Sequence, residues 1–188
     1  AMHLTWNHLW FLPYLLAYSF IIWAVYPLLT HVWLSSLWRW CASKTSMAVV
    51  ILLPILISYI LGALLDEDNP VTLNFVQDWF NHARSLLVFL IGFVLVRMPF
   101  IWSRFASLRW YFLCVAVFTY GYIVFSFNGG SLGDGVVAKA IDRVFWTANG
   151  WFWMLTLIAW AQYWFGFSNP LLKYLNNGAY CFYILHQT

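Results

Sequence analysis

Two histidines stand inside or beside long apolar runs, where titratable side chains are uncommon. His8 lies in "NHLWFL" at the start of the first apolar run, and His186 lies in "FYILHQT" near the end of the chain. A histidine has a pKa near neutrality, so it can act as a general base or orient one. An ionisable group within a membrane segment is a functional hypothesis by default, although His186 could also hydrogen-bond a neighbouring helix as a neutral side chain. His8, beside Trp6 and Trp10, could equally belong to an interfacial aromatic belt.

A second pair of chemically capable residues is His82 and Arg84 in "WFNHARS". Together they make a cationic spot at the start of an apolar segment. Such a spot suits a phosphate or a carboxylate of a substrate, and it equally suits lipid headgroups. We therefore regard both residues as candidate substrate-binding residues.

Other residue types that could do chemistry form weaker patterns. The three cysteines, Cys41, Cys114 and Cys181, are far apart and show no CxxC spacing, so neither a disulfide framework nor a zinc site is indicated. The segment "GGSLGDG" lacks the GK[ST] ending of a phosphate-binding loop, and "DED" lacks the EF-hand pattern. We predict no metal site and no bound cofactor.

The amino-acid composition indicates whether these residues are surrounded by water or by lipid. Of the 188 residues, 64% are hydrophobic and 8% are charged, whereas a soluble domain has about 25% charged residues. The 14 Trp and 11 Tyr suit membrane–water interfaces. The nine Lys and Arg are dispersed, which is not the pattern of a nucleic-acid-binding protein. The sequence therefore predicts an integral-membrane protein in contact with the lipid bilayer.

The apolar segments predict an all-α fold, a polytopic bundle of transmembrane helices forming one integral-membrane domain over residues 1–188. A spanning helix needs about 20 mainly apolar residues. Five segments meet or nearly meet this length, and a sixth begins near Gly178. The five are residues 9–29, 46–65, 79–102, 108–127 and 144–167. We expect Gly150 to interrupt the fifth softly, and we expect Arg84 and Arg97 to reach toward headgroups at the two ends of the third.

Charge in the loops predicts the orientation, because Lys and Arg concentrate on the cytoplasmic side. Basic residues follow the first, third and fifth predicted helices, whereas the loops at 66–78 and 128–135 are acidic or glycine-rich. The latter loops should face outward, although Lys139 and Arg143 follow the second of them. On this topology His8 lies at the outer surface, and His186 lies about 12 Å from the cytoplasmic face, counted at about 1.5 Å per residue from Gly178.

Two segments together resemble signature segments of the bacterial acyltransferase family 3. They are "NHLWFLPYLLAYS" at residues 7–19 and "SNPLLKYLNNGAYCFYILHQT" at residues 168–188. The segment "FLIGFVLVRMPFIWSRFASLRW" at residues 89–110 is similar to the family's small-residue helix and the basic cytoplasmic loop after it. Members of this family are membrane proteins that O-acylate cell-envelope carbohydrates, and relatives modify periplasmic glucans.

The resemblance implies a bundle of roughly ten helices in the bacterial inner membrane. It also implies an acyl donor from the cytoplasm, commonly acyl-coenzyme A, and a sugar acceptor at the outer face. The family's N-terminal helices, which carry an arginine followed by the histidine usually held to be catalytic, do not occur in this sequence. The chain therefore resembles the C-terminal two-thirds or so of such an enzyme, and we expect this part alone to be inactive.

The resemblance also implies the roles of individual residues in acyl transfer from a thioester to a hydroxyl. We expect His8 to position or polarise the acceptor hydroxyl from the outer side, with Asn7 and Trp10 beside it in the substrate site. His186 would act deeper, near the path of the thioester or in support of the histidine in the N-terminal helices. The two histidines would differ in depth by about 15 Å, half of a membrane core of about 30 Å, so they would not share one proton.

Two other classes of protein fit the same helices. A transporter or flippase for the envelope glycan or its lipid-linked precursor would also need apolar helices, polar histidines and aromatic walls. A scaffold subunit would use them only for assembly. Dependence on an acyl donor separates these classes, because an enzyme leaves an ester on its product and a carrier leaves its substrate unchanged.

Overall fold

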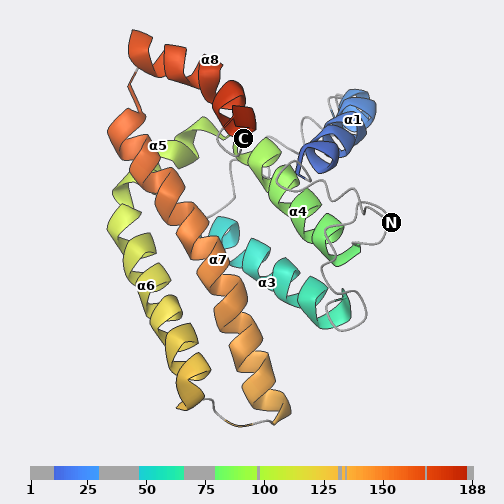
Figure 1. Cartoon of the computed structure of the whole chain (residues 1–188), viewed down its shortest axis with the longest axis vertical. Coiled ribbons are helices and arrows are strands. Elements are labelled where there is room, and N and C mark those ends of the chain that lie inside the picture. Colours follow the sequence, from blue (N-terminus) through green and yellow to red (C-terminus); the bar gives the residue numbers. More distant parts are fainter. Residues whose placement is uncertain are drawn as a thin grey trace.

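The computed structural model describes residues 11–29, 47–65, 79–96, 98–130, 133, 135–167 and 169–185, and every regular element within them is helical (Figure 1). Within these residues the all-α prediction is confirmed. The elements, in chain order, are α1 (Phe11–Leu29), α3 (Met47–Leu65), α4 (Trp79–Val96), α5 (Pro99–Ser107), α6 (Arg109–Phe125), the short π-helical turn η2 (Ser126–Gly130), α7 (Val136–Phe165) and α8 (Pro170–Leu185).

Three stretches of the described chain are long and apolar enough to cross a membrane, namely Met47–Leu65, Trp79–Val96 and Arg109–Gly130. The apolar stretch Leu12–Pro27 of α1 is shorter. These helices are largely uncovered, since only 6% of the α4 window is buried inside the described structure. Apolar surface of this extent needs a covering other than water. The helices therefore indicate a membrane protein, while the count of five spans remains a prediction.

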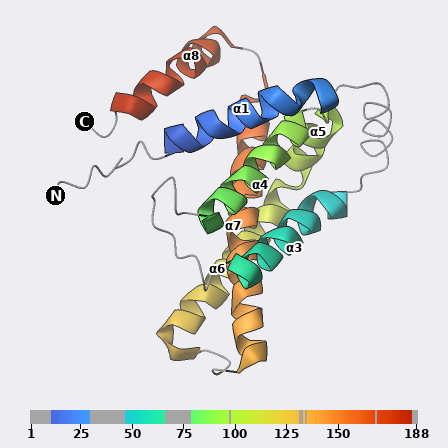
Figure 2. The ribbon, with the colours of Figure 1, turned by 90° about the vertical axis from the view of Figure 1, so that its right-hand side faces the viewer.

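The best-packed part of the molecule is the antiparallel pair of α6 and α7, which lie side by side (Figures 1 and 2). Phe105 of α5, Phe112 of α6 and Leu155 of α7 are all 0% exposed and belong to one core cluster. Ala116 and Ala159 are also fully buried there. Small residues let helix backbones approach closely, which is how helices gain contact in a membrane. The described core is therefore centred on the contact of α7 with α5 and α6.

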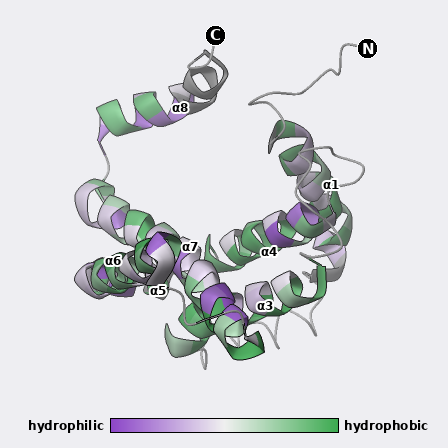
Figure 3. Ribbon diagram, turned by 60° about the horizontal axis from the view of Figure 1, so that its bottom comes forward, coloured by the Kyte–Doolittle hydropathy of each residue, from purple (hydrophilic) through white to green (hydrophobic). Residues whose placement is uncertain are grey.

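The remaining helices are arranged around this pair. α3 packs against both α4 and α7, on the side of α7 away from α6 (Figure 1). α1 packs on α4, and α8 lies apart from α1 and α4 (Figure 3). Most of the α3 ribbon is hydrophobic, whereas hydrophilic segments stand out on α4 and α7 (Figure 3). Hydrophilic residues are therefore more prominent on α4 and α7 than on α3.

The predicted third span, 79–102, is wrong at its end, because α4 stops at Val96 and a separate helix, α5, begins at Pro99. A proline has no backbone N–H and disfavours helical geometry in the residue before it. Met98 accordingly has φ −116° and ψ 72°, outside the helical region. The backbone N–H of Met98 still donates to the Leu95 carbonyl at 3.0 Å, so the bend stays tight.

Two other predicted boundaries are also wrong. α7 begins at Val136 instead of 144 and runs without interruption through Gly150. α8 begins at Pro170 instead of Gly178. In each case the added turns mix apolar residues with charged or amide residues, and such a mixture still propagates a helix although it is less apolar than a membrane core. At α8 the Asn169 side chain caps the helix, accepting a hydrogen bond from the Leu171 N–H at 2.9 Å.

Leu155 and Leu157 test where the core of α7 lies, because they are two residues apart on one helix. Leu155 is 0% exposed and Leu157 is 67% exposed. We expect Leu155→Ala to lower the free energy of unfolding by about 2–5 kcal/mol, through lost contacts and a cavity. Leu157→Ala should leave it nearly unchanged. The measurement is thermal unfolding of the purified chain in detergent, followed by tryptophan fluorescence. Equal midpoints for the two variants would contradict this description of the core.

Candidate functional site

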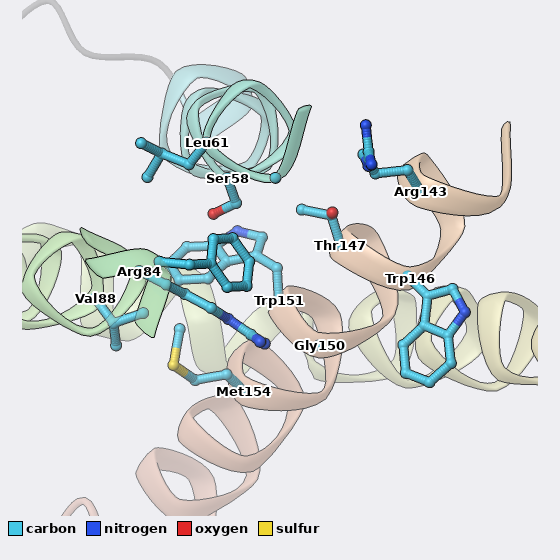
Figure 4. Close-up of a pocket in the computed structure, with 12 residues that line it drawn as sticks. Ser58, Leu61, Arg84, Val88, Arg143, Trp146, Thr147, Gly150, Trp151 and Met154 are labelled. Atoms are coloured by element: carbon cyan, nitrogen blue, oxygen red, sulfur yellow. The ribbon is translucent and has the colours of Figure 1, made fainter. Parts of the chain in front are cut away.

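A cavity of about 340 Å³ lies between α3, α4 and α7 (Figure 4). Its polar lining comes from all three helices: Ser58 of α3, Arg84 of α4, and Arg143, Thr147 and Trp151 of α7. Aromatic and aliphatic side chains complete the walls, among them Phe80, Val88 and Met154. Ligand pockets in proteins commonly have about 300–1,000 Å³ and combine an apolar lining with a few convergent polar groups. This cavity has both properties.

The spacing of residues along α7 explains why its polar side chains face the cavity together. Arg143, Thr147, Gly150 and Met154 follow one another at intervals of four, three and four residues, which places them on one face of a helix. Residues of the core cluster on α7 repeat the same intervals, but they begin five residues later, at Ala148. Five residues turn a helix by about 140°, so the polar and the buried faces of α7 point in different directions.

Two glycines lie close to the arginines. A β-carbon at Gly150 would lie 3.7 Å from Nη2 of Arg84, and a β-carbon at Gly62 would lie 3.6 Å from Cδ of Arg143. Each arginine therefore crosses a glycine of a facing helix at close range: Arg84 extends from α4 over α7 (Figure 4), and Arg143 extends from α7 over α3. At Gly62 the neighbour is the stem of Arg143, and at Gly150 it is the guanidinium group of Arg84. A β-carbon at either position would make an ordinary van der Waals contact.

The polar groups of the cavity are rich in hydrogen-bond donors. Two guanidinium groups, two hydroxyls and the indoles of Trp146 and Trp151 line it, and none of its lining residues is Asp or Glu. Trp151 is only 7% exposed, and its Nε1 has no hydrogen-bond partner within the described structure. A buried donor without a partner costs about 1–3 kcal/mol. The cavity is therefore suited to a ligand that accepts hydrogen bonds and carries negative charge.

His82 does not face this cavity, although it lies two residues from Arg84. Its ring stacks on Tyr14 with centroids 4.3 Å apart, and the hydroxyl of Tyr18 lies 3.0 Å from its Nδ1. Tyr18 also donates to the His82 carbonyl oxygen at 3.2 Å. The hydrogen bond between the Tyr18 hydroxyl and Nδ1 can run in either direction, because the imidazole ring has two tautomers. Side chains two residues apart on a helix point about 160° away from each other, so His82 and Arg84 form no shared cationic spot. His82 instead joins α4 to α1.

The other predicted site residues, Asn7, His8, Trp10 and His186, lie outside the residues that the structure describes. Their roles stay predictions. The depth predicted for His186, counted from Gly178, stays a prediction as well.

Sequence reasoning missed the contributions of Arg143, Thr147, Trp151 and Ser58 to the cavity. The spacing of Arg143, Thr147 and Gly150 indicates that they share one face of a helix. It does not indicate which other helices pack against that face. The polar contacts between α6 and α7 were also missed. Tyr122 donates to Asp142 at 2.8 Å, and Thr119 donates to Asn149 at 3.2 Å. These groups bond to each other and hold the pair together.

The chain was also compared with known proteins. No protein-family model, no curated protein and no solved structure matches it. Within the described residues, no group of three or more His, Cys, Asp or Glu side chains could hold a metal ion. The chemistry of the site therefore has to be argued from its own residues.

The contact between Tyr18 and His82 predicts a measurable coupling between α1 and α4. Tyr18→Phe and His82→Phe each remove one side of the hydrogen bond and keep an aromatic ring, so each should cost about 1 kcal/mol. The double variant should unfold at nearly the same temperature as the less stable single variant, because both remove the same interaction. Thermal unfolding of the four proteins measures this.

Ser19→Ala is the matched control, since the Ser19 hydroxyl donates only within its own helix, to the Leu15 carbonyl at 2.7 Å. Its effect should add to that of His82→Phe. Fully additive losses for Tyr18→Phe and His82→Phe would contradict the described contact.

Proposed function

We propose that this protein is an integral-membrane O-acyltransferase of the bacterial inner membrane. It would move an acyl group from a cytoplasmic donor, acyl-coenzyme A, to a hydroxyl of an extracytoplasmic glycan. The observation that carries the proposal is the pair of segments at residues 7–19 and 168–188, with the predicted spans between them. The apolar helices and the polar cavity between them are compatible with this activity.

The proposed topology has five spans and the start of a sixth. On this topology the end of α3, the start of α4 and the first half of α7 all lie toward the outer side. The cavity residues Ser58, Arg84 and Arg143 belong to these three segments, so the cavity would lie near the compartment of the glycan. α7 has 30 residues, a length of about 45 Å, which exceeds a membrane core of about 30 Å. Its first turns, with Lys139 and Asp142, would extend beyond the apolar core.

The proposed reaction is attack of the glycan hydroxyl oxygen on the thioester carbonyl carbon. The new C–O bond forms, the C–S bond breaks, and the thiol of coenzyme A leaves with the proton that the hydroxyl gives up. A base must take that proton, and donors must stabilise the negative charge on the carbonyl oxygen. His8 would position the acceptor hydroxyl beside Asn7 and Trp10, and His186 would act nearer the thioester.

A carrier for the glycan or its lipid-linked precursor is the competing proposal. A cavity lined by arginines and aromatic rings between membrane helices would also suit the headgroup of a carried lipid. The two functions differ in their product. Only the transferase leaves a new ester on the glycan.

Ester formation in cells tests the transferase. The full-length gene is expressed in a host that lacks it, and ester-linked acyl groups on envelope glycans are measured by mass spectrometry at matched membrane abundance. We expect ester with the wild type and a loss of about 100-fold or more with His186→Ala, because a positioned acid–base group contributes about 10²–10⁴-fold to the rate. His31→Ala is the control, because His31 belongs to none of the predicted site segments, and it should leave the ester level unchanged.

Ester that is equal in wild type and His186→Ala would remove His186 from the working site. A wild type that adds no ester to any envelope glycan would overturn the transferase and favour the carrier.

A further inference from the structure

We propose that the cavity between α3, α4 and α7 is a binding site for the phosphate group of an amphiphilic molecule. This inference goes beyond acyl transfer and does not depend on it, because a transferase and a carrier could both use such a site. It assigns a shared function to residues of three helices, of which sequence reasoning had picked out only Arg84.

The charge of the cavity is the first support. Arg84 and Arg143 both line it, and no lining residue is acidic. Guanidinium groups present several N–H donors in a fixed plane and match the oxygens of a phosphate well. Charged side chains between membrane helices are costly unless an opposite charge or many hydrogen bonds compensate them. A bound phosphate would supply both for Arg84.

The neutral donors are the second support. Trp151 is more than nine-tenths buried, and its indole nitrogen has no hydrogen-bond partner within the described structure. In Figure 4 this nitrogen lies on the edge of the ring nearest α3 and Ser58. An indole N–H can only donate, so a ligand that satisfies it must accept. The hydroxyls of Ser58 and Thr147, which also line the cavity, add two more donors for phosphate oxygens.

The apolar walls and the size of the cavity indicate the rest of the ligand. A volume of about 340 Å³ is larger than a phosphate group needs, and Leu61, Val88 and Met154 line the remainder. These side chains suit hydrocarbon next to the phosphate. The molecule is therefore an amphiphile, either a phospholipid of the bilayer or a phosphate-bearing substrate, and the experiment distinguishes the two sources.

The experiment measures binding to the purified chain in detergent by native mass spectrometry. The probes are phosphatidylglycerol and diacylglycerol with the same acyl chains, so that only the phosphoglycerol headgroup differs between them. We expect phosphatidylglycerol to bind at least about tenfold more tightly, the effect of one or more charge-assisted hydrogen bonds. Arg84→Gln and Arg143→Gln should each lower the affinity for phosphatidylglycerol about tenfold. Arg104→Gln, which changes an exposed arginine of α5, should not.

A second pair of variants isolates the indole donor. Trp151→Phe keeps an aromatic ring and removes only the N–H, and it should weaken phosphatidylglycerol binding by a few fold. Trp153→Phe is the matched control, since Trp153 is half-buried two residues away and does not line the cavity. Thermal unfolding of each variant without lipid verifies that it is folded before its binding is compared.

Competition with inorganic phosphate then identifies the source of the ligand. If phosphate alone does not displace phosphatidylglycerol, the site takes a phospholipid of the bilayer. If phosphate displaces it, the site recognises the phosphate of a substrate with little help from the lipid chain. Equal binding of phosphatidylglycerol and diacylglycerol would overturn the proposal, as would folded Arg84→Gln and Arg143→Gln variants that bind phosphatidylglycerol like wild type.

Discussion

The packing of α7 against α6 is the contact on which the rest of the described structure depends. One face of α7 places Ala148, Phe152 and Leu155 against α5 and α6, where small and aromatic side chains close the core. Because hydrophobic burial is weak between helices in lipid, close van der Waals contact and interhelical hydrogen bonds have to supply the stability. Thr119 with Asn149 and Tyr122 with Asp142 add two such bonds along this pair.

A second face of α7, turned by about 140° from the core face, carries Arg143 and Thr147, and Trp151 belongs both to the core cluster and to the cavity lining. Arg143, Thr147 and Trp151 then line a cavity whose other walls come from α3 and α4. The two arginines pass close to Gly62 and Gly150 of the facing helices. The same helix therefore serves as a core element on one side and as one wall of a binding cavity on the other. α1 is held differently, through the stacking and hydrogen bonding of Tyr14 and Tyr18 with His82.

The predicted boundaries that failed share a physical cause. Hydropathy indicates where a helix could lie in lipid, but it does not indicate where helical geometry begins or ends. The chain breaks after Val96 because of the backbone restriction that Pro99 imposes. α7 and α8 begin earlier than predicted because polar residues also continue a helix outside the apolar core. Predictions based on apolar length were thus best for Met47–Leu65, where helix and apolar run end together.

The sequence by itself determined that this protein is helical and of the membrane type. With 64% hydrophobic and 8% charged residues the chain suits lipid, and in lipid the backbone N–H and C=O groups must bond to each other, as they do in helices. It also singled out His82 and Arg84. Only the tertiary structure decided that these two residues point to different neighbours, one to α1 and the other to the cavity with Arg143. Helical periodicity orients side chains within one helix, whereas the partner of each face depends on how helices far apart in the chain pack together.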